Sequence, residues 1–360
     1  MSELPRGSID NKGGHAAVSA KTVSEQSVDL GTEWVSRLVL VTGAGGFIGS
    51  HLVEGLVARG AKVRAFVRYN SARREGNLRF LDPSVRDAVE VIYGDLRDLA
   101  AVQEAAVGAD TIFHLGASIS IPYSYIHPGE VVDTNVGGTF NVLQAARDTG
   151  LRRIVLTSTS EVYGTAQYVP MDEQHPLQPQ SPYAASKVGA DMLGLSFHRA
   201  FQLPVSIIRP FNTYGPRQSM RAVIPTIITQ ALTQDAIQLG ALHPTRDFLF
   251  VEDAVRGFMS MARDDQAIGE VIHVGHGSTI GIGELAQLIV DIVGRRVQLV
   301  SDKERIRPET SEVLRLHADR HKAETLLGWT PQVSLREGLA RTVAWIADHV
   351  TEFEPTVYYR

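Results

Sequence analysis

The sequence predicts an α/β protein in which a doubly wound parallel sheet is followed by a smaller mixed α/β lobe. Short apolar runs alternate with segments of helical spacing from Arg37 to Pro210, which is typical of a parallel sheet with helices on both faces. A glycine-rich turn also joins the first apolar run to the first helical segment. After Pro210 the alternation breaks, and we expect the second half to cover the carboxyl ends of the strands, where ligands bind in such sheets.

The predicted strands of the first half are short and almost continuously apolar, as buried strands are. We expect these strands at residues 37–41, 61–67, 89–95, 109–117, 151–158 and 203–210. Helices are expected between them at residues 51–60, 96–108, 128–150 and 182–201. In the second half we expect helices at residues 225–233, 251–263 and 335–349, and a short strand at 270–274.

The length of 360 residues predicts about two domains. Residues 1–34 are polar, rich in Gly and Ser and without the apolar core of a signal peptide, so we expect a disordered tail. We assign residues 35–210 to a dinucleotide-binding domain and residues 211–360 to a substrate-binding lobe.

The composition excludes several classes of protein. A formal net charge of −5 gives no basic field for nucleic acid, and no apolar run has the length of about 20 residues that a membrane span needs. The absence of cysteine removes disulfides and thiolate catalysis, and it fits a reducing, cytoplasmic location. The twelve histidines show no metal-ligand spacing, so no metal is expected.

The glycine-rich turn has the spacing of a dinucleotide-binding loop. Gly43, Gly46 and Gly49 follow a predicted strand and open a predicted helix, which is the context that separates such a loop from an ordinary glycine turn. Gly43 can make the tight turn, Gly46 lets the backbone approach a pyrophosphate, and Gly49 lets helix and strand pack closely. The helix N-terminus then offers free N–H groups and a partial positive charge.

The end of the second predicted strand favours NADP over NAD. An acidic residue there would bind the ribose 2′-hydroxyl, whereas an arginine accommodates a 2′-phosphate. This chain has Arg68 at that position, with Arg73 and Arg74 nearby. The alternative is that Arg68 stacks on the adenine, which suits either cofactor.

A tyrosine and a lysine stand four residues apart on a predicted helix. Tyr183 and Lys187 therefore share one helix face, and the lysine cation should favour the phenolate and lower the tyrosine pKa. A phenolate can take a proton from a sugar hydroxyl while hydride leaves the same carbon. The hydroxyl-rich stretch Thr157–Glu161 ends the fifth predicted strand and is the expected partner of this pair.

These segments together resemble one family, the extended short-chain dehydrogenase/reductases that act as nucleotide-sugar epimerases and dehydratases. The matching pieces are VTGAGGFIGSHL, YGDLRD, FHLGA, TNVGGTFNVLQAA, STSEVYG, SPYAASK, RPFNTYGPR and TRDFLFVED. The resemblance implies a Rossmann fold, a tightly bound NAD(P) that is regenerated in each cycle, a nucleotide-sugar substrate and a homodimer. In the family, the dimer forms through a four-helix bundle.

The resemblance also assigns individual residues. It places Gly43, Gly46, Phe47, Ile48, Gly49, Arg68, Asp95, Leu96, Leu115, Ala117, Ser118, Thr157, Tyr183, Lys187 and Pro210 at the cofactor. It places Ser120, Asn212, Arg221, Arg246 and Arg307 at the substrate, where arginines suit a diphosphate. For each arginine an exposed salt bridge is an equal alternative. The implied catalytic residues are Thr159, Ser160, Glu161, Tyr183 and Lys187.

The triplet Thr159-Ser160-Glu161 narrows the implied chemistry. Many 4-epimerases of the family lack an acid at the position of Glu161, whereas 4,6-dehydratases carry a glutamate that removes the proton from C5. Glucose-type dehydratases have an aspartate where this chain has Ser160, which leaves the acid for the departing hydroxyl unassigned. UDP-glucuronate decarboxylases share Thr-Ser-Glu and are the main alternative.

The surrounding segments look closest to 4,6-dehydratases that act on NDP-N-acetylglucosamine, with GDP-mannose-type dehydratases as relatives. We therefore expect a 4,6-dehydratase, and a decarboxylase or a 4-epimerase as alternatives. A non-catalytic dinucleotide-binding protein is a further alternative, which the intact Tyr183, Lys187 and Glu161 oppose.

Overall fold

The computed structural model describes residues 32–302 and 312–352. The tail expected at residues 1–34 lies outside this description up to residue 31. Its last three residues correct the expectation, because Thr32–Trp34 form a 3-10 helix, η1, and Trp34 is buried. The indole packs on Phe113 with ring centroids 6.0 Å apart, so the folded chain begins before residue 35.

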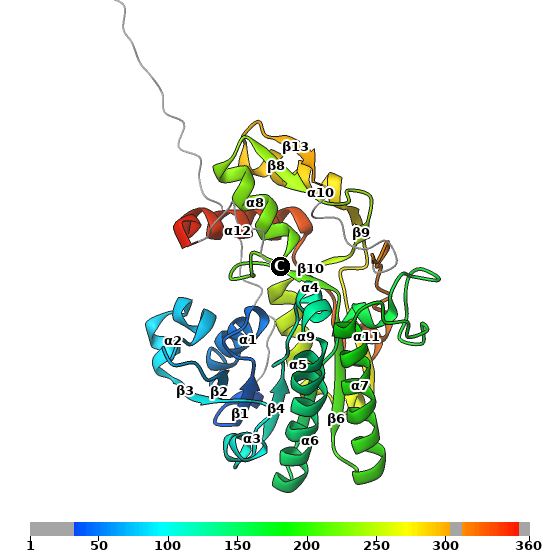
Figure 1. Ribbon diagram of the computed structural model, residues 1–360. Coiled ribbons are helices and arrows are strands. Elements are labelled where there is room, and N and C mark those ends of the chain that lie inside the picture. Colours follow the sequence, from blue (N-terminus) through cyan, green and yellow to red (C-terminus); the bar gives the residue numbers. More distant parts are fainter. Residues whose placement is uncertain (1–31, 303–311, 353–360) are drawn as a thin grey trace, which may run out of the picture. The chain divides into compact units, whose positions relative to one another are not determined.

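A seven-stranded parallel sheet forms the centre of the fold, with the strand order β3-β2-β1-β4-β5-β6-β11 (Figure 1). The strands are β1 (Leu38–Thr42), β2 (Lys62–Arg68), β3 (Val89–Gly94), β4 (Thr111–His114), β5 (Arg153–Thr157), β6 (Val205–Pro210) and β11 (Val271–Val274). From β1 the chain adds strands in one direction through β2 and β3, and it then returns to add β4 on the other side of β1. The carboxyl ends of the neighbouring strands β1 and β4 thus form a topological switch point, the place where open α/β sheets bind ligands.

Helices cover both faces of this sheet, as the alternation in the sequence predicts (Figure 1). Val39 and Val41 of β1 point to one face and pack with α1 (Phe47–Val57) and α9 (Val251–Arg263). Leu40, between them, points to the other face and joins a cluster with α3 (Leu99–Ala106), α6 (Gly138–Thr149) and α7 (Pro182–Phe201). This arrangement follows from the two-residue period of a strand that is buried on both sides.

The helix expected at residues 128–150 contains a π-helical turn. It consists of α5 (Pro128–Val132), the π turn η3 (Asp133–Gly137) and α6, which ends at Gly150 in a left-handed conformation. Single π turns inside α-helices are frequent at functional sites. Here the turn carries Asn135, which is buried.

The second half of the chain contributes to the central sheet, which corrects one expectation. The strand expected at residues 270–274 is β11, and it pairs in parallel with β6 as the last strand of the sheet. Helix α9 has the predicted bounds and packs against α1 and the sheet. The chain therefore passes between the sheet and the second lobe more than once, while the division into domains at residue 210 stays a prediction.

The second lobe has its own apolar core, formed mainly by three helices. These helices are α8 (Val223–Thr233), α10 (Ile282–Val293) and α12 (Leu335–Asp348). Short strands accompany them in three pairs: β7 (Asn212–Tyr214) with β10 (Phe248–Phe250), β8 (Ala236–Leu239) with β13 (Gln298–Ser301), and β9 (Thr245–Arg246) with β12 (Ile280–Gly281). The remaining short elements are η2 (Gly76–Phe80), α2 (Pro83–Asp87), α4 (Ile121–Ile126), η4 (Ser160–Tyr163), η5 (Asp265–Ala267), α11 (His321–Leu327) and η8 (Val350–Glu352).

None of the helices in the described ranges is long and apolar enough to cross a membrane.

Candidate active site

The glycine turn lies on the β1 side of the switch point. Gly43 has φ +68°, a conformation that favours glycine, and a Cβ there would lie 2.7 Å from the main-chain nitrogen of Gly116. A Cβ on Gly49 would lie 2.3 Å from the carbonyl oxygen of Gly43, so α1 must approach the turn without a side chain. Gly46 precedes α1 and has no side chain to cap it, which leaves the first N–H groups of the helix available to an anion. Phe47 and Ile48 form the start of this helix.

The loop after β4 lies on the other side of the switch point and is fixed by two side chains. The Thr42 hydroxyl accepts a hydrogen bond of 3.1 Å from the main-chain nitrogen of Gly116, between Leu115 and Ala117. The Asn135 carboxamide accepts from the Ser118 nitrogen at 2.7 Å and donates to the Ser118 carbonyl at 3.0 Å.

Asn135 also donates to the Ser186 hydroxyl at 2.9 Å, and so it ties this loop to the first turns of α7. In the sequence, only its place in the segment TNVGGTFNVLQAA marks Asn135.

The ends of β2 and β3 form the edge where the adenosine is expected. Arg68 ends β2 with a side chain that is 77% exposed, and one of its guanidinium nitrogens lies 3.9 Å from a Glu130 carboxylate oxygen. Asp95 follows β3 and pairs with Arg97 at 2.6 Å, and the Arg97 hydrogen bonds lower the pKa of Asp95 to about 2. Leu96 fills the space beside two glycines, Gly116 and Gly138.

Tyr183 and Lys187 are both buried in the first turns of α7, where Ser181 caps the helix. The expected lowering of the tyrosine pKa is wrong for this environment. Burial raises the pKa of Tyr183 well above its usual value, and a hydrogen bond with Thr159 offsets only part of this effect. Burial also lowers the pKa of Lys187, while the nearby Asp191 carboxylate raises it. Both residues lie on one helix, but the sequence did not reveal how strongly both side chains are desolvated.

The residues that follow β5 contact Tyr183, and the sequence predicts this partner for the stretch Thr157–Glu161. The Thr159 hydroxyl accepts a hydrogen bond of 3.2 Å from the Glu161 nitrogen and is also hydrogen-bonded to Tyr183. The Glu161 carboxylate is close enough for its charge to raise the pKa of Tyr183. Ser160 is buried in the same 3-10 turn, η4. The fold therefore gathers Thr159, Glu161 and Tyr183 from two separate segments.

Two buried polar atoms near these strand ends have no hydrogen-bond partner among the described residues. They are the Thr157 hydroxyl, at the end of β5, and the Asn212 side-chain oxygen, at the start of β7. Buried polar atoms are nearly always paired, so each is a candidate contact for a bound molecule. Pro210 ends β6 between them in the sequence and is buried. The glycine turn and these unpaired atoms fit a dinucleotide and a polar substrate.

The other predicted substrate contacts are spread over several elements in both halves of the chain. Arg246 is buried in β9 and donates a hydrogen bond of 3.2 Å to the Glu312 carboxylate. Arg221 is exposed before α8, and Ser120 caps α4 by accepting from the Tyr123 nitrogen at 3.3 Å. Arg307 lies outside the described residues. The roles of all four stay predictions.

Within the described ranges, no group of three or more His, Cys, Asp or Glu residues could hold a metal ion.

The fold and these strand ends define an NAD(P)-dependent enzyme of the doubly wound α/β class. The family model described as GDP-mannose 4,6 dehydratase matches residues 40–342. The chain belongs to this family, within the extended short-chain dehydrogenase/reductases that include nucleotide-sugar dehydratases and epimerases.

Known relatives have more than one activity. The chain is 35% identical over 327 residues to a dTDP-glucose 4,6-dehydratase of Streptomyces griseus, covering 89% of this chain and 97% of the relative. It is 37% identical over 311 residues to a UDP-glucose 4-epimerase of Mycolicibacterium smegmatis, covering 84% and 96%. A dTDP-glucose 4,6-dehydratase of Streptomyces venezuelae, solved with NAD bound, superposes with a TM-score of 0.79 at 34% identity and covers 88% of this chain and 99% of its own.

The glycine turn leads to a first prediction. A Cβ on Gly46 would meet one protein atom, the Gly43 carbonyl oxygen at 3.0 Å, so a side chain here mainly obstructs the approach of a pyrophosphate. We expect Gly46→Val to abolish NAD(P) binding, measured by calorimetry and by the cofactor retained on purification. Gly129→Val is the control, because a Cβ at Gly129 meets nothing within 4 Å. Undiminished binding in the Gly46 variant would contradict the assignment.

Proposed function

We propose that the protein is a nucleotide-sugar 4,6-dehydratase, which converts an NDP-hexose into the NDP-4-keto-6-deoxy sugar. An N-acetylglucosamine-type sugar is the substrate that the sequence resemblance favours. The observation that carries the proposal is the meeting of Glu161 and Thr159 with Tyr183 at the carboxyl end of β5. A dehydratase needs a base for a carbon-bound proton beside the group that handles the C4 hydroxyl, and the Glu161 carboxylate supplies this second base next to the Tyr183 phenol.

The first step is the oxidation of C4. The glycine turn Gly43–Gly49 would hold NAD(P), which would supply the hydride acceptor for C4 and the hydride donor for C6. Tyr183 takes the proton of the C4 hydroxyl, and Thr159 holds that hydroxyl by a hydrogen bond. Because burial raises the pKa of Tyr183, the phenolate has to be stabilised, and Lys187 is the cation on the same helix face that can do so.

The second step is the loss of water across C5 and C6. The C4 ketone acidifies the C5–H bond, and Glu161 takes that proton. The C6–O bond breaks and the hydroxyl takes up a proton and leaves as water; the proton released from the C4 hydroxyl balances this uptake overall. C5 regains the proton held by Glu161 when hydride returns to C6, so the cycle consumes no external reactant. Glu161 lies in the turn after β5, whereas Tyr183 lies on α7, so the two proton transfers are served by different segments.

A 4-epimerase or a UDP-glucuronate decarboxylase is the alternative function on the same site. Both begin with oxidation at C4, so Tyr183 and Lys187 do not separate them from a dehydratase. The fate of the 4-keto intermediate does separate them. A screen of UDP-, GDP- and dTDP-sugars by mass spectrometry distinguishes the loss of one water from isomerisation and from the loss of carbon dioxide.

Substitution of Glu161 tests the proposal directly. Glu161→Gln keeps the shape of the side chain but removes its basicity, and loss of a positioned general base costs about 10² to 10⁴ in rate. We expect this variant to transfer hydride and then stall, so that reduced nicotinamide accumulates while no 4-keto-6-deoxy sugar forms and no solvent deuterium enters C5. Tyr183→Phe should block hydride transfer itself. Turnover of the true substrate by Glu161→Gln at the wild-type rate would remove the main support for a dehydratase.

We propose further that the cofactor is NADP, because Arg68 is an exposed arginine at the end of β2 where an acid would select NAD. Arg68→Ala should then weaken NADP binding more than NAD binding, as measured by calorimetry with each cofactor. Arg79→Ala serves as control, since Arg79 is an exposed arginine that pairs with Glu352. Equal weakening of both cofactors by Arg68→Ala would indicate stacking on the adenine instead.

We also propose a homodimer that forms through the α5–α7 surface. Four apolar side chains on these helices are about half exposed: Val132 (44%), Phe140 (42%), Met192 (45%) and Phe201 (50%). Helices α6 and α7 lie side by side on one face of the sheet (Figure 1). A two-fold pairing of this surface would cover these side chains in the commonest oligomer symmetry.

Light scattering should therefore give about twice the chain mass of 39.3 kDa at micromolar concentration. Phe140→Glu should shift the protein to the monomer, because a carboxylate would have to be buried in an apolar interface. Val300→Glu is a matched control, since Val300 is equally exposed (42%) but lies on β13 of the second lobe. A monomer mass for the wild type would overturn this proposal.

A further inference from the structure

A buried arginine contacts the two segments that carry the proposed catalytic residues, the turn η4 after β5 and helix α7. Arg209, in β6, is 2% exposed. Its Nε and one Nη donate to the same Asp191 carboxylate oxygen at 3.2 and 2.7 Å, and its other Nη donates to the Tyr163 hydroxyl at 2.5 Å. Asp191 is 2% exposed and Tyr163 is fully buried, so all of these bonds are shielded from water.

Each partner of Arg209 belongs to a segment that carries proposed catalytic residues. Asp191 lies one helical turn after Lys187 on α7, and its charge raises the pKa of Lys187. Asp191 also accepts a hydrogen bond of 2.7 Å from the hydroxyl of Ser158, the residue directly after β5. Tyr163 is the last residue of η4, two positions after Glu161. The forked guanidinium suits this task, because its N–H groups diverge in fixed directions.

The hydrogen bonds beyond Tyr163 run in one direction. The Tyr163 oxygen accepts from Arg209, and its proton is donated to the His273 Nε2 at 2.5 Å in the neutral tautomer whose Nδ1–H faces the Met171 carbonyl. The His273 Nδ1 then donates to the Met171 carbonyl at 3.2 Å. Burial lowers the pKa of His273 to about 3, in agreement with a neutral ring of this tautomer.

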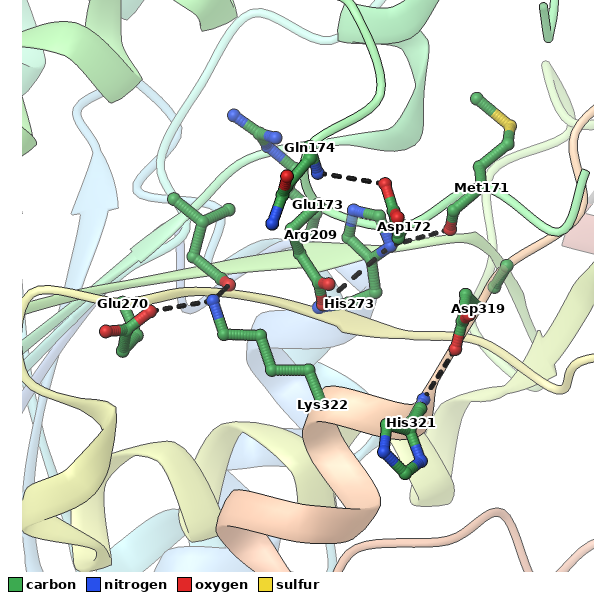
Figure 2. A network of polar contacts seen from close by, with 12 residues as sticks. Met171, Asp172, Glu173, Gln174, Arg209, Glu270, His273, Asp319, His321 and Lys322 are labelled. Atoms are coloured by element: carbon green, nitrogen blue, oxygen red, sulfur yellow. Dashed lines mark hydrogen bonds and ion pairs between the residues drawn. The ribbon is translucent and has the colours of Figure 1, made fainter. Parts of the chain in front are cut away.

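The outer end of the network is anchored on the chain that follows the Glu161 turn. Figure 2 shows His273 beside Arg209 and Glu173, and the Glu173 carboxylate accepts a bond of 2.8 Å from the His273 main-chain nitrogen. Strand β11 is held there by Lys322, which donates to the Val271 carbonyl and pairs with Glu270 at 2.7 Å (Figure 2). Tyr163 is therefore hydrogen-bonded to two partners that are themselves held in place, Arg209 and His273.

From this geometry we propose that Arg209 is a positioning residue that sets the Glu161 turn against the Tyr183–Lys187 helix through Tyr163 and Asp191. The inference rests on the proposed function, since it assigns these two segments to two successive steps. The Tyr163 arm serves the removal of the C5 proton, and the Asp191 arm serves the oxidation at C4. A displacement of about 1 Å in a catalytic group can cost about 10²-fold in rate, so loss of one arm should slow one step more than the other.

Tyr163→Phe tests the first arm, because it removes one hydroxyl and leaves the ring in place. We expect hydride transfer, followed by stopped-flow absorbance of reduced nicotinamide, to stay within about threefold of wild type. Elimination, followed by solvent deuterium at C5 and by product formation, should slow about 10- to 100-fold, with KM unchanged. The control is Tyr214→Phe, which removes another buried tyrosine hydroxyl, one that donates to the Leu335 carbonyl at 3.1 Å outside this network.

Asp191→Asn tests the second arm and should slow hydride transfer at least about tenfold, since it removes the charge beside Lys187. Equal slowing of both steps by Tyr163→Phe, or no slowing of either, overturns the proposal even if Asp191→Asn does not fold. A wild type that never releases water refutes the proposed function instead. In that case amide hydrogen exchange in Tyr163→Phe tests whether Arg209 holds the turn at residues 161–164. Faster exchange in this turn, with exchange in α7 unchanged, supports the positioning role. Unchanged exchange in the turn overturns it.

Discussion

The constraint on which the site depends is that all seven central strands are parallel, so their carboxyl ends meet at one edge of the sheet. The reversal of strand order between β1 and β4 opens that edge. The glycine turn after β1 and the Asn135-held loop after β4 then face each other, and the ends of β5 and β6 extend the same row. Residues far apart in the chain reach one site because the topology leaves each of them at the end of a strand.

Burial shifts the pKa values of the two central side chains of this site, and it makes their ionised forms less stable. Tyr183 and Lys187 are almost completely shielded, which raises the pKa of the phenol and lowers that of the amine. Both shifts favour the neutral forms, so the pair reaches the ionised state only with help from neighbouring charges. Asp191 supplies such a charge for Lys187, and Arg209 neutralises Asp191 in turn. The two cations thus flank a single carboxylate, and a Tyr183 phenolate would balance the positive charge that remains.

The sequence was sufficient where a local signal decides the outcome. Helix α7 has the predicted bounds because Ser181 caps it and proline follows at its first position. The glycine turn was recognisable because strand, turn and helix are consecutive. The placement of β11 beside β6 could not be recognised from the sequence. That pairing joins segments about sixty residues apart, and only the tertiary fold specifies it. The π turn at Asn135 was also missed, since a shift of one residue in the hydrogen bonding hardly changes the apolar period.

The same distinction explains why the polar network was missed. Asp191 stands four residues after Lys187, a spacing that is readable in the sequence, but nothing local indicates that its partner is Arg209 at the end of an apolar strand. An arginine in that position suggests a strand that reaches solvent, whereas the structure buries it completely among Asp191 and Tyr163. A buried guanidinium is stable only when every neighbour is arranged for it. Such a group links the segments it contacts, and here those segments carry Glu161 and Tyr183, the two residues proposed to transfer protons.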